Sequence, residues 1–412
     1  MTKPDPQPFD QLAPHPTGPL AGVRIVDLTS VVFGAYATQI LADLGAEVIK
    51  VESPGGPRAG GGDVQRWTGD APAGAPDLGP TFVNLNRNKR SLLLDLNEAA
   101  SMAALRELIA GADMFAATIR YEGMKRLGLD YESVKKFKPD ILYVHGSGYG
   151  SSGPYAGQAA HDDLIQAQSG CADLIWRVDG SDRPRYLPTL AGDKISGLFL
   201  AQAMLAGLFH RQRTGEGQFV EVPMFESVTS FVLTEHFFGH VYDPPTGPWG
   251  YQRIMSPDRK PFKTKDGFIS VLFFSIQQWR RFFRLAGQDE LVDDLRFIDQ
   301  EAVRENIAAL HGLLERTTVE RTSSEWVEAL AGKGVQAAAV NRLEDLQNDP
   351  HLKAVGFFQH LEHPDAGAYA AMRSPLLFEK TPASLHRHAP RLGEHNAEIL
   401  GPDGAVAPAA DG

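Results

Sequence analysis

The chain has 412 residues, of which 43% are hydrophobic and 22% are charged. This composition is typical of a folded globular protein and excludes the disordered, collagen-like and coiled-coil classes. Because the length exceeds what one hydrophobic core usually serves, it predicts two or more structural units. The formal net charge of −11 argues against nucleic acid as a partner, since phosphate binding requires clustered Lys and Arg. An anionic ligand would need a local basic pocket.

The single cysteine, Cys171, excludes disulfide frameworks and cysteine-rich metal or iron–sulfur sites. We expect it to be a small buried side chain, and we expect a reducing, cytoplasmic location. The N-terminal segment, Met1 to Pro19, is rich in proline and has no continuous apolar stretch, so it predicts a flexible arm over residues 1–18 rather than a signal peptide. The longest apolar run, Leu198 to Phe209, is too short to cross a bilayer.

The first predicted elements form a βαβ unit. Val23 to Leu28 is an apolar strand, Ala35 to Leu44 has helical spacing, and Glu47 to Glu52 is a second strand. Further strands are predicted at Ser91 to Leu96, Met114 to Thr118 and Ile141 to Gly146, with a helix at Glu98 to Gly111 among them. Alternating strands and helices predict an α/β fold with a mostly parallel sheet.

The second half begins with a long apolar helix from Gly192 to about Arg213, followed by a strand at Gln218 to Pro223. The Pro- and Gly-rich stretch Tyr242 to Pro261 is typical of a connection between domains. Asp266-Gly267 before the apolar run Phe268 to Phe274 predicts a hairpin and a strand. Helices through Leu330 and a short strand at Val335 to Val340 are expected after it.

Glu52, at the end of the second strand, raises the possibility of a nicotinamide or flavin site, where an acidic residue commonly holds a ribose. Only one glycine, Gly34, follows the first strand, where a pyrophosphate-binding turn needs several. Ordinary NAD binding is therefore disfavoured. The cluster Gly60-Gly61-Gly62-Asp63 does not join a predicted strand to a predicted helix, so we interpret it as a flexible loop.

Several blocks, taken together and in order, resemble the class III CoA-transferase family, which includes formyl-CoA transferases, carnitine CoA-transferases and the divergent α-methylacyl-CoA racemases. The blocks are Pro19-Leu-Ala-Gly-Val-Arg-Ile-Val-Asp-Leu-Thr, Leu44-Gly-Ala-Glu-Val-Ile-Lys-Val-Glu, Asn88-Lys-Arg-Ser-Leu-Leu-Leu-Asp-Leu, Gly123-Met-Lys-Arg-Leu-Gly-Leu, Gly146-Ser-Gly-Tyr-Gly, Ala191-Gly-Asp, Arg213-Thr-Gly-Glu-Gly-Gln, Asn348-Asp-Pro and Pro390-Arg-Leu-Gly-Glu-His.

The resemblance implies a large Rossmann-like α/β domain made from both chain ends and a smaller α+β domain from the middle of the chain. It also implies an interlocked homodimer, with the active site between the domains and near the dimer interface. The expected boundaries are a flexible arm at 1–18, the N-terminal part of the large domain at 19–225, the small domain with its linkers at 226–330, and a return segment at 331–412.

By resemblance, the catalytic nucleophile is Asp193, in the Gly-Asp step before the long apolar helix. A carboxylate suits CoA transfer because it becomes an acyl group, first in a mixed anhydride and then in an enzyme thioester. The helix N-terminus is expected to favour the ionised form and to stabilise developing oxyanions, and Gly192 is expected to leave space for the thioester. The alternative role is plain helix capping, for which aspartate is a favoured residue.

The cluster His161-Asp162-Asp163 resembles the block in which racemase relatives carry a catalytic aspartate, which here is Asp162. Racemisation needs an acid and a base on opposite faces of the α-carbon, and no histidine lies between His15 and His145 to serve as the partner. We therefore interpret Asp162 as structural or CoA-facing. Two alternatives to CoA transfer stay open, a racemase-type isomerase and a non-catalytic acyl-CoA-binding homologue.

The family's CoA-binding positions carry over to eight residues: Val31, Val32, Leu94, Asn97, Thr118, Ile119, Arg126 and His161. The Arg126 guanidinium is expected to pair with a CoA phosphate. Arg66, Lys89 and Arg185 could meet a second substrate carboxylate, but we interpret them as ordinary surface charges. The expected substrates are an acyl-CoA and a small carboxylic acid, with coenzyme A entering as a thioester. No permanently bound cofactor, metal, nucleic acid or membrane is expected.

Overall fold

The computed structural model describes residues 11–55, 60–401 and 406. Its contacts divide the chain into two compact units. The first comprises the residues up to Trp176, Ser181–His236 and the residues from Pro350 onward. The second comprises Arg177–Gly180 and Phe237–Asp349.

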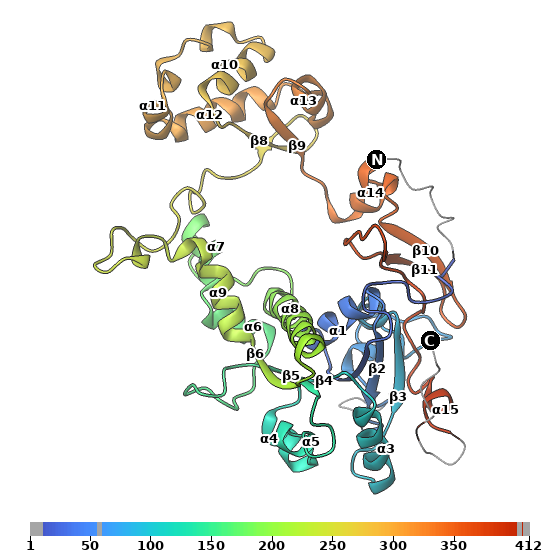
Figure 1. Ribbon diagram of the computed structural model, residues 1–412. Coiled ribbons are helices and arrows are strands. Elements are labelled where there is room, and N and C mark those ends of the chain that lie inside the picture. The colour runs from blue at the N-terminus through green and yellow to red at the C-terminus, as the bar shows by residue number, and fades with distance from the viewer. Residues whose placement is uncertain (1–10, 56–59, 402–405, 407–412) are drawn as a thin grey trace. The chain divides into compact units, whose positions relative to one another are not determined.

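A six-stranded sheet with the order β3-β2-β1-β4-β5-β6 forms the centre of the first unit, and all its neighbouring strands are parallel (Figure 1). The strands are β1 Arg24–Leu28, β2 Glu47–Glu52, β3 Lys89–Leu93, β4 Met114–Ala117, β5 Leu142–Ser147 and β6 Gln218–Pro223. The α/β prediction and each of these predicted strands are confirmed. The strand order reverses between β1 and β4, and ligands of such sheets bind at this point, outside the carboxyl ends of the strands.

Two apolar layers cover the faces of this sheet. Alternation along β1 sends Ile25 into one layer, with α1 and α8, and Val26 into the other, with α3, α4 and α5. The helices of this unit are α1 Phe33–Asp43, α2 Pro80–Asn86, α3 Ala99–Ala110, α4 Tyr121–Leu127, α5 Tyr131–Val134, α6 Asp162–Gln168, α8 Ala191–Thr214, α9 Met224–His236, α14 Pro350–Ala354 and α15 Asn396–Ile399. Helix α7, Cys171–Asp179, starts in the first unit and ends in the second.

The C-terminal segment returns to the first unit and lies along the outer edge of β3. The Asn396 side chain accepts a hydrogen bond from the Leu93 amide at 2.9 Å and donates one to the Leu93 carbonyl at 3.1 Å, as a neighbouring strand would. The hairpin of β10 (Phe358–His363) and β11 (Gly367–Met372) belongs to the same return. Residues 1–10 of the expected arm lie outside the described residues, whereas Ala13 and Thr17 are hydrogen bonded to the return segment.

The second unit has its own core. Strands β7 Phe262–Lys263, β8 Phe268–Leu272 and β9 Gln336–Ala339 form an antiparallel sheet, and the predicted hairpin and strands are confirmed. Its helices are α10 Ile276–Leu285, α11 Gln300–Glu305, α12 Ile307–Thr318 and α13 Ser323–Leu330. Capping boxes at Ser275 and Thr322 start α10 and α13, and Trp326 and Phe282 stack in the middle of the core.

The prediction of a flexible loop at Gly60-Gly61-Gly62-Asp63 is wrong. A Cβ on Gly60 would lie 1.9 Å from the Trp67 ring, and the Trp67 indole donates a hydrogen bond to the Gly61 carbonyl. Gly61 and Gly62 have φ values of 73° and 70°, which glycine adopts without steric cost. The loop is therefore a packed turn that sends Asp63 into the interior.

Cys171 is buried, as predicted. None of the helices formed by the described residues has the length and apolar character needed to cross a bilayer.

Candidate functional site

The site is built at the start of α8, which packs closely on α1. A Cβ on Gly197 would lie 2.9 Å from the Phe33 carbonyl oxygen, so glycine is required where the two helices meet. Asp193 lies one turn earlier on α8, in its first turn. Because Phe33 begins α1 directly after the β1 turn, Asp193 lies at the same edge of the sheet as the carboxyl end of β1.

Asp162 belongs to a different helix, α6, and accepts a hydrogen bond from a backbone amide at the start of α8. Its Oδ1 accepts a hydrogen bond from the Asp193 backbone N–H at 3.0 Å, and its Oδ2 accepts one from Gln166 at 2.7 Å. The first amides of a helix have no partner within the helix, so this contact replaces a cap on the helix itself. A Cβ on Gly192 would lie 3.1 Å from Asp162 Oδ1. A Cβ at position 192 would crowd Asp162, so glycine is favoured there, and the expected space for a thioester stays a prediction.

Asp193 is 9% exposed as a residue, and among the described residues its carboxylate accepts no hydrogen bond. Burial, followed by the negative charge of Asp162, raises the pKa of Asp193 from 3.8 to about 7. Burial and the like charge of Asp162 act on the pKa of Asp193 in the direction opposite to that expected of the helix N-terminus. A buried carboxyl with a pKa near neutrality and free oxygens can act as a nucleophile.

Four of the sequence-predicted CoA residues meet at the point where the strand order reverses. Val31 and Val32 follow β1, and Thr118 and Ile119 follow β4, its neighbour in the sheet. The two turns touch, since the Ser30 amide lies 3.3 Å from Thr118 Oγ1. Helix α1 begins at this turn without a side-chain cap, which leaves amides of its first turn for an anionic group.

A buried histidine supports the second turn. His145 Nε2 lies 2.8 Å from the Ile119 carbonyl oxygen, and because a carbonyl only accepts, this nitrogen carries the proton. Burial lowers the pKa of His145, which keeps the ring neutral. The imidazole therefore fixes the Ile119 backbone without adding charge to the site.

The other four predicted residues follow the carboxyl ends of β3, β4 and β5 and are less closely grouped. Leu94 is buried, and the Asn97 side chain donates to Asp95. Arg126 is exposed on α4 and has no hydrogen-bond or ion-pair partner within the described ranges, so its guanidinium is available for a phosphate. His161 is exposed and occupies the N-cap position of α6, where its side chain makes no capping hydrogen bond.

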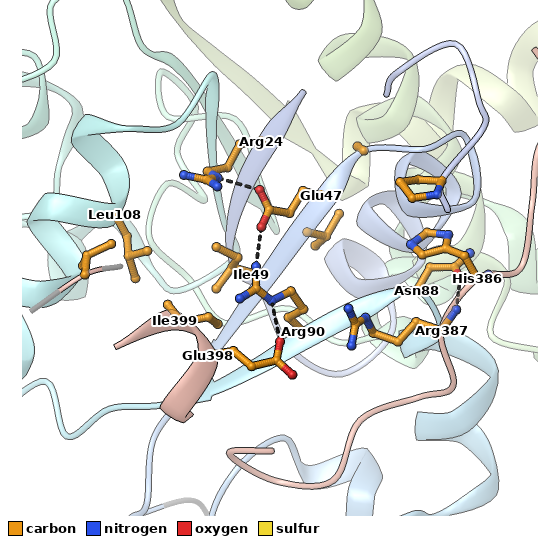
Figure 2. Close-up of a pocket in the computed structure, with 14 residues that line it drawn as sticks. Arg24, Glu47, Ile49, Asn88, Arg90, Leu108, His386, Arg387, Glu398 and Ile399 are labelled. Carbon is orange, nitrogen blue, oxygen red and sulfur yellow. Dashed lines mark hydrogen bonds and ion pairs between the residues drawn. The ribbon is translucent and has the colours of Figure 1, made fainter. Parts of the chain in front are cut away.

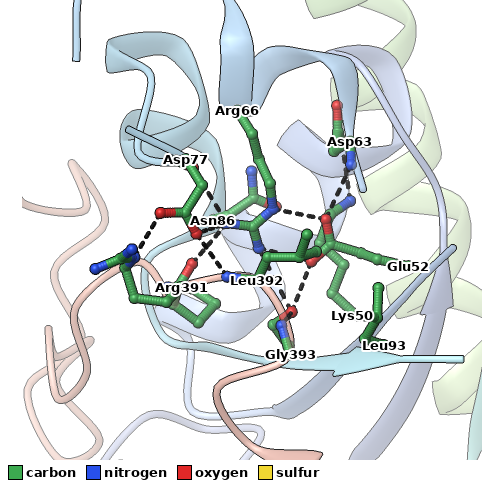
Figure 3. Close-up of polar contacts among 12 residues, drawn as sticks. Lys50, Glu52, Asp63, Arg66, Asp77, Asn86, Leu93, Arg391, Leu392 and Gly393 are labelled. Atoms are coloured by element: carbon green, nitrogen blue, oxygen red, sulfur yellow. Dashed lines mark hydrogen bonds and ion pairs between the residues drawn. The ribbon is translucent and has the colours of Figure 1, made fainter. Parts of the chain in front are cut away.

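A cluster of buried charges lies behind the β1 turn and was missed by the sequence analysis (Figure 3). Arg66 and Lys89 are fully buried, so their interpretation as surface charges is wrong, whereas Arg185 is exposed. Arg66 forms two hydrogen bonds to Glu52, at 2.6 and 2.8 Å. Burial opposes ionisation of Glu52, but Arg66 outweighs it and lowers the pKa of Glu52 to about 2. Glu52 is therefore not available to hold a ribose.

A cavity of about 330 Å³ lies at the opposite edge of the sheet, at the amino ends of the first three strands (Figure 2). Its Arg24 and Arg90 both pair with Glu47. It lies away from the carboxyl ends of the strands, so we do not assign the substrate site to it. In the described part of the chain, no three His, Cys, Asp or Glu side chains are grouped to hold a metal ion.

The chain resembles known proteins over nearly its whole length. The family model for CoA-transferase family III matches residues 20–396. The chain is 30% identical to a succinate–glutarate CoA-transferase of Agrobacterium fabrum, over 94% of this chain and 96% of that protein. It is 31% identical to the succinyl-CoA:glutarate CoA-transferase of Mus musculus, over 93% and 86%. The crystal structure of a CaiB/BaiF family protein from Brucella suis superposes with a TM-score of 0.80 at 30% identity, over 93% and 98%.

The chain therefore belongs to CoA-transferase family III and is an enzyme that transfers coenzyme A.

Proposed function

We propose that this enzyme moves CoA from an acyl-CoA to a carboxylic acid through covalent intermediates on Asp193. The observation that carries the proposal is the Asp193 carboxyl itself, which is buried, has a pKa of about 7 and accepts no hydrogen bond from the residues described. The CoA moiety would bind along the carboxyl ends of the strands. Its proposed contacts are Val31, Val32, Leu94, Asn97, Thr118, Ile119, Arg126 and His161.

The chemistry runs in four balanced steps. An Asp193 oxygen attacks the thioester carbonyl and releases the CoA thiolate, which leaves a mixed anhydride. The thiolate attacks the aspartyl carbonyl of this anhydride and releases the donor acid, which leaves an aspartyl-CoA thioester. The acceptor carboxylate then attacks the same aspartyl carbonyl and releases the thiolate. The thiolate finally attacks the acceptor acyl group, which regenerates the Asp193 carboxylate and gives the new acyl-CoA.

The raised pKa of Asp193 favours this chemistry. An anion that is poorly solvated by its surroundings loses little solvation when it attacks a carbonyl. The anhydride and the thioester are neutral at this carboxyl, so forming either one removes the repulsion from Asp162 that raises the pKa in the resting enzyme.

Dicarboxylic substrates are the proposed class, with succinyl-CoA as the donor to test first. The support comes from the relatives named for succinate and glutarate and from one for mesaconate in Haloarcula hispanica, 29% identical over 93% of this chain. Next to the nucleophile, Lys194 is exposed and its only polar partner in the described chain is the Thr189 hydroxyl. This ammonium could meet a second substrate carboxylate.

The test is to trap the intermediate. The enzyme is incubated with succinyl-CoA and quenched with hydroxylamine or borohydride, and mass spectrometry is used to find the modified residue. We expect the modification at Asp193, its loss in Asp193→Asn, and its retention in Asp163→Asn, which changes an exposed carboxylate on α6. If no adduct forms with any acyl-CoA while the α-proton exchanges with solvent deuterium, the enzyme is instead an isomerase of the racemase type.

We also propose that the enzyme is a cytoplasmic homodimer in which the two chains interlock. An apolar stripe on α8, formed by Leu198, Leu205 and Phe209, is between 37% and 61% exposed, and Phe231 on α9 is 57% exposed. These positions on α8 share one face of the helix, and a second copy of the chain would bury them. Light scattering should give twice the chain mass, and Phe209→Glu should shift the protein toward the monomer. A monomeric wild-type enzyme would contradict the proposal.

A further inference from the structure

The turn between β1 and α1 contains a backbone conformation that its side chain disfavours. Val31 has a φ of 65°, in the left-handed region. A β-branched residue is a steric outlier there, whereas glycine adopts this conformation freely. Something outside the turn must therefore hold it in place.

Two buried charged groups hold the turn from both sides. Both carboxylate oxygens of Asp63 lie 3.2 Å from the Val31 amide nitrogen. The Lys50 ammonium lies 2.9 Å from Asp63 Oδ2 and donates to the Thr29 carbonyl at 2.8 Å. Each of the two charged side chains is 1% exposed. Lys50 thus binds the Thr29 carbonyl before the turn, and Asp63 binds the Val31 amide within it. Figure 3 shows Lys50 and Asp63 pointing toward each other.

The packed glycine loop brings Asp63 to this position. A Cβ on Gly62 would lie 2.9 Å from a Glu52 carboxylate oxygen and 2.7 Å from Leu392, so a side chain is excluded there. The Glu52 carboxylate in turn accepts a hydrogen bond from the Asp63 amide at 3.0 Å. Burying an ion pair rarely adds net stability. The Lys50–Asp63 pair is therefore better explained by the turn geometry that it fixes than by a gain in folding stability.

We propose that Asp63 and Lys50 form a clamp. They are positioning residues that hold the Val31 turn, before any ligand arrives, in the conformation that receives CoA. The inference rests on the proposed binding of CoA by Val31 and Val32. Burial would lower the pKa of Lys50, but Asp63, Asp27 and Glu52 outweigh burial and raise it. The Lys50 ammonium therefore stays charged throughout the neutral range.

The first measurement needs no variant. Hydrogen exchange of the Val31 amide, resolved by fragmenting the peptide containing residues 29–33 in the mass spectrometer, should be slow in the free wild-type enzyme and change little when CoA is added. If this amide exchanges rapidly until CoA binds, the ligand orders the turn and the clamp does not, which overturns the inference.

The second measurement uses kinetics and a rescue. Asp63→Asn should raise the KM for succinyl-CoA by about tenfold or more, since backbone strain of this kind costs enough to depopulate the bound conformation, while kcat changes much less. Asp63→Glu keeps the charge beside Lys50 but displaces the carboxylate, and it should act in the same direction. Adding Val31→Gly to Asp63→Asn should recover most of the lost affinity, because glycine needs no clamp.

The matched control is Asp77→Asn, which removes a buried carboxylate of the same cluster that pairs with Arg66 and Arg391 but does not touch the turn. It should leave the KM unchanged. An Asp63→Asn enzyme with a normal KM, or a double variant with no recovery, would refute the inference. A wild-type enzyme that binds no CoA by calorimetry would instead contradict the proposed function, while the exchange data would still report on the clamp.

Discussion

Replacing the nucleophile should stabilise the protein, and the gain should depend on pH. In Asp193→Asn the buried carboxyl gives way to a neutral amide of nearly the same shape. Because folding raises the pKa of Asp193 from 3.8 to about 7, the folded state holds a proton that the unfolded chain has already lost at pH values between these two. Stability therefore falls as pH rises through this window and stays constant above it.

The magnitude follows from the pKa values of the folded and unfolded states. A tenfold difference between their proton affinities corresponds to about 1.4 kcal/mol, so the raised pKa of Asp193 lowers the free energy of unfolding by about 1.5 kcal/mol at pH 5 and about 4 kcal/mol at pH 8. The Asn variant escapes this cost. Its advantage over wild type in the free energy of unfolding should therefore grow by about 2.5 kcal/mol between pH 5 and pH 8.

Urea denaturation at several pH values measures this difference directly. Asp163→Asn is the control, because it removes an exposed carboxylate near the same site and should show no such trend. An advantage for Asp193→Asn that is constant with pH, or a loss of stability that grows with pH, would refute the reasoning that burial and Asp162 set this pKa.

Four further outcomes can be measured. The wild-type kcat/KM should rise about tenfold per pH unit below pH 7 and level off above it, because only ionised Asp193 attacks; a profile that is flat from pH 5 to pH 8 would exclude Asp193 as the titrating nucleophile. Asp162→Asn removes a negative charge that raises the pKa of Asp193 but keeps an oxygen for the Asp193 amide, so the rise of kcat/KM with pH should move to lower pH. An unchanged midpoint of the kcat/KM profile would contradict the role of Asp162 in raising this pKa. Arg126→Ala should raise the KM for acyl-CoA by about tenfold with little change in kcat, whereas Lys125→Ala, which removes a neighbouring cation already paired on its own helix, should not. Arg66→Met should lower the free energy of unfolding by about 3–5 kcal/mol, because it leaves a buried carboxylate unpaired; a loss below about 1 kcal/mol in urea denaturation would show that the pair is dispensable.

The sheet could be predicted because its signal is local. The strands of the first unit are short apolar runs bounded by turns, and helical spacing separates them. The cover of helices on the sheet then follows from the rules for parallel sheets, whereas the order of the strands was not predicted. The position of Asp193 at the start of an apolar helix could be read in the same way.

The electrostatics of the site could not be predicted, because they depend on residues far apart in the chain. Asp162 lies 31 residues before Asp193, and only the fold brings its carboxylate to the start of α8. Likewise, Lys50 occupies an interior position of a strand whose neighbouring residues are apolar, and its partner Asp63 follows three glycines that are typical of a flexible loop. The available signal for the clamp was therefore twofold: Lys50 is charged inside an apolar strand, and the acidic Asp63 follows glycines further along the same segment.

The outer edge of β3 is covered by the Asn396 side chain, and this matters while the chain is being synthesised. Asn396 is 303 residues away from the Leu93 backbone groups that it satisfies. At the usual pace of translation, the growing sheet would wait roughly 15 to 60 seconds with this edge open to other chains. Truncated products that lack the last turns should therefore aggregate through β3 although they retain every strand of the sheet, and a chaperone that shields this edge should rescue their solubility.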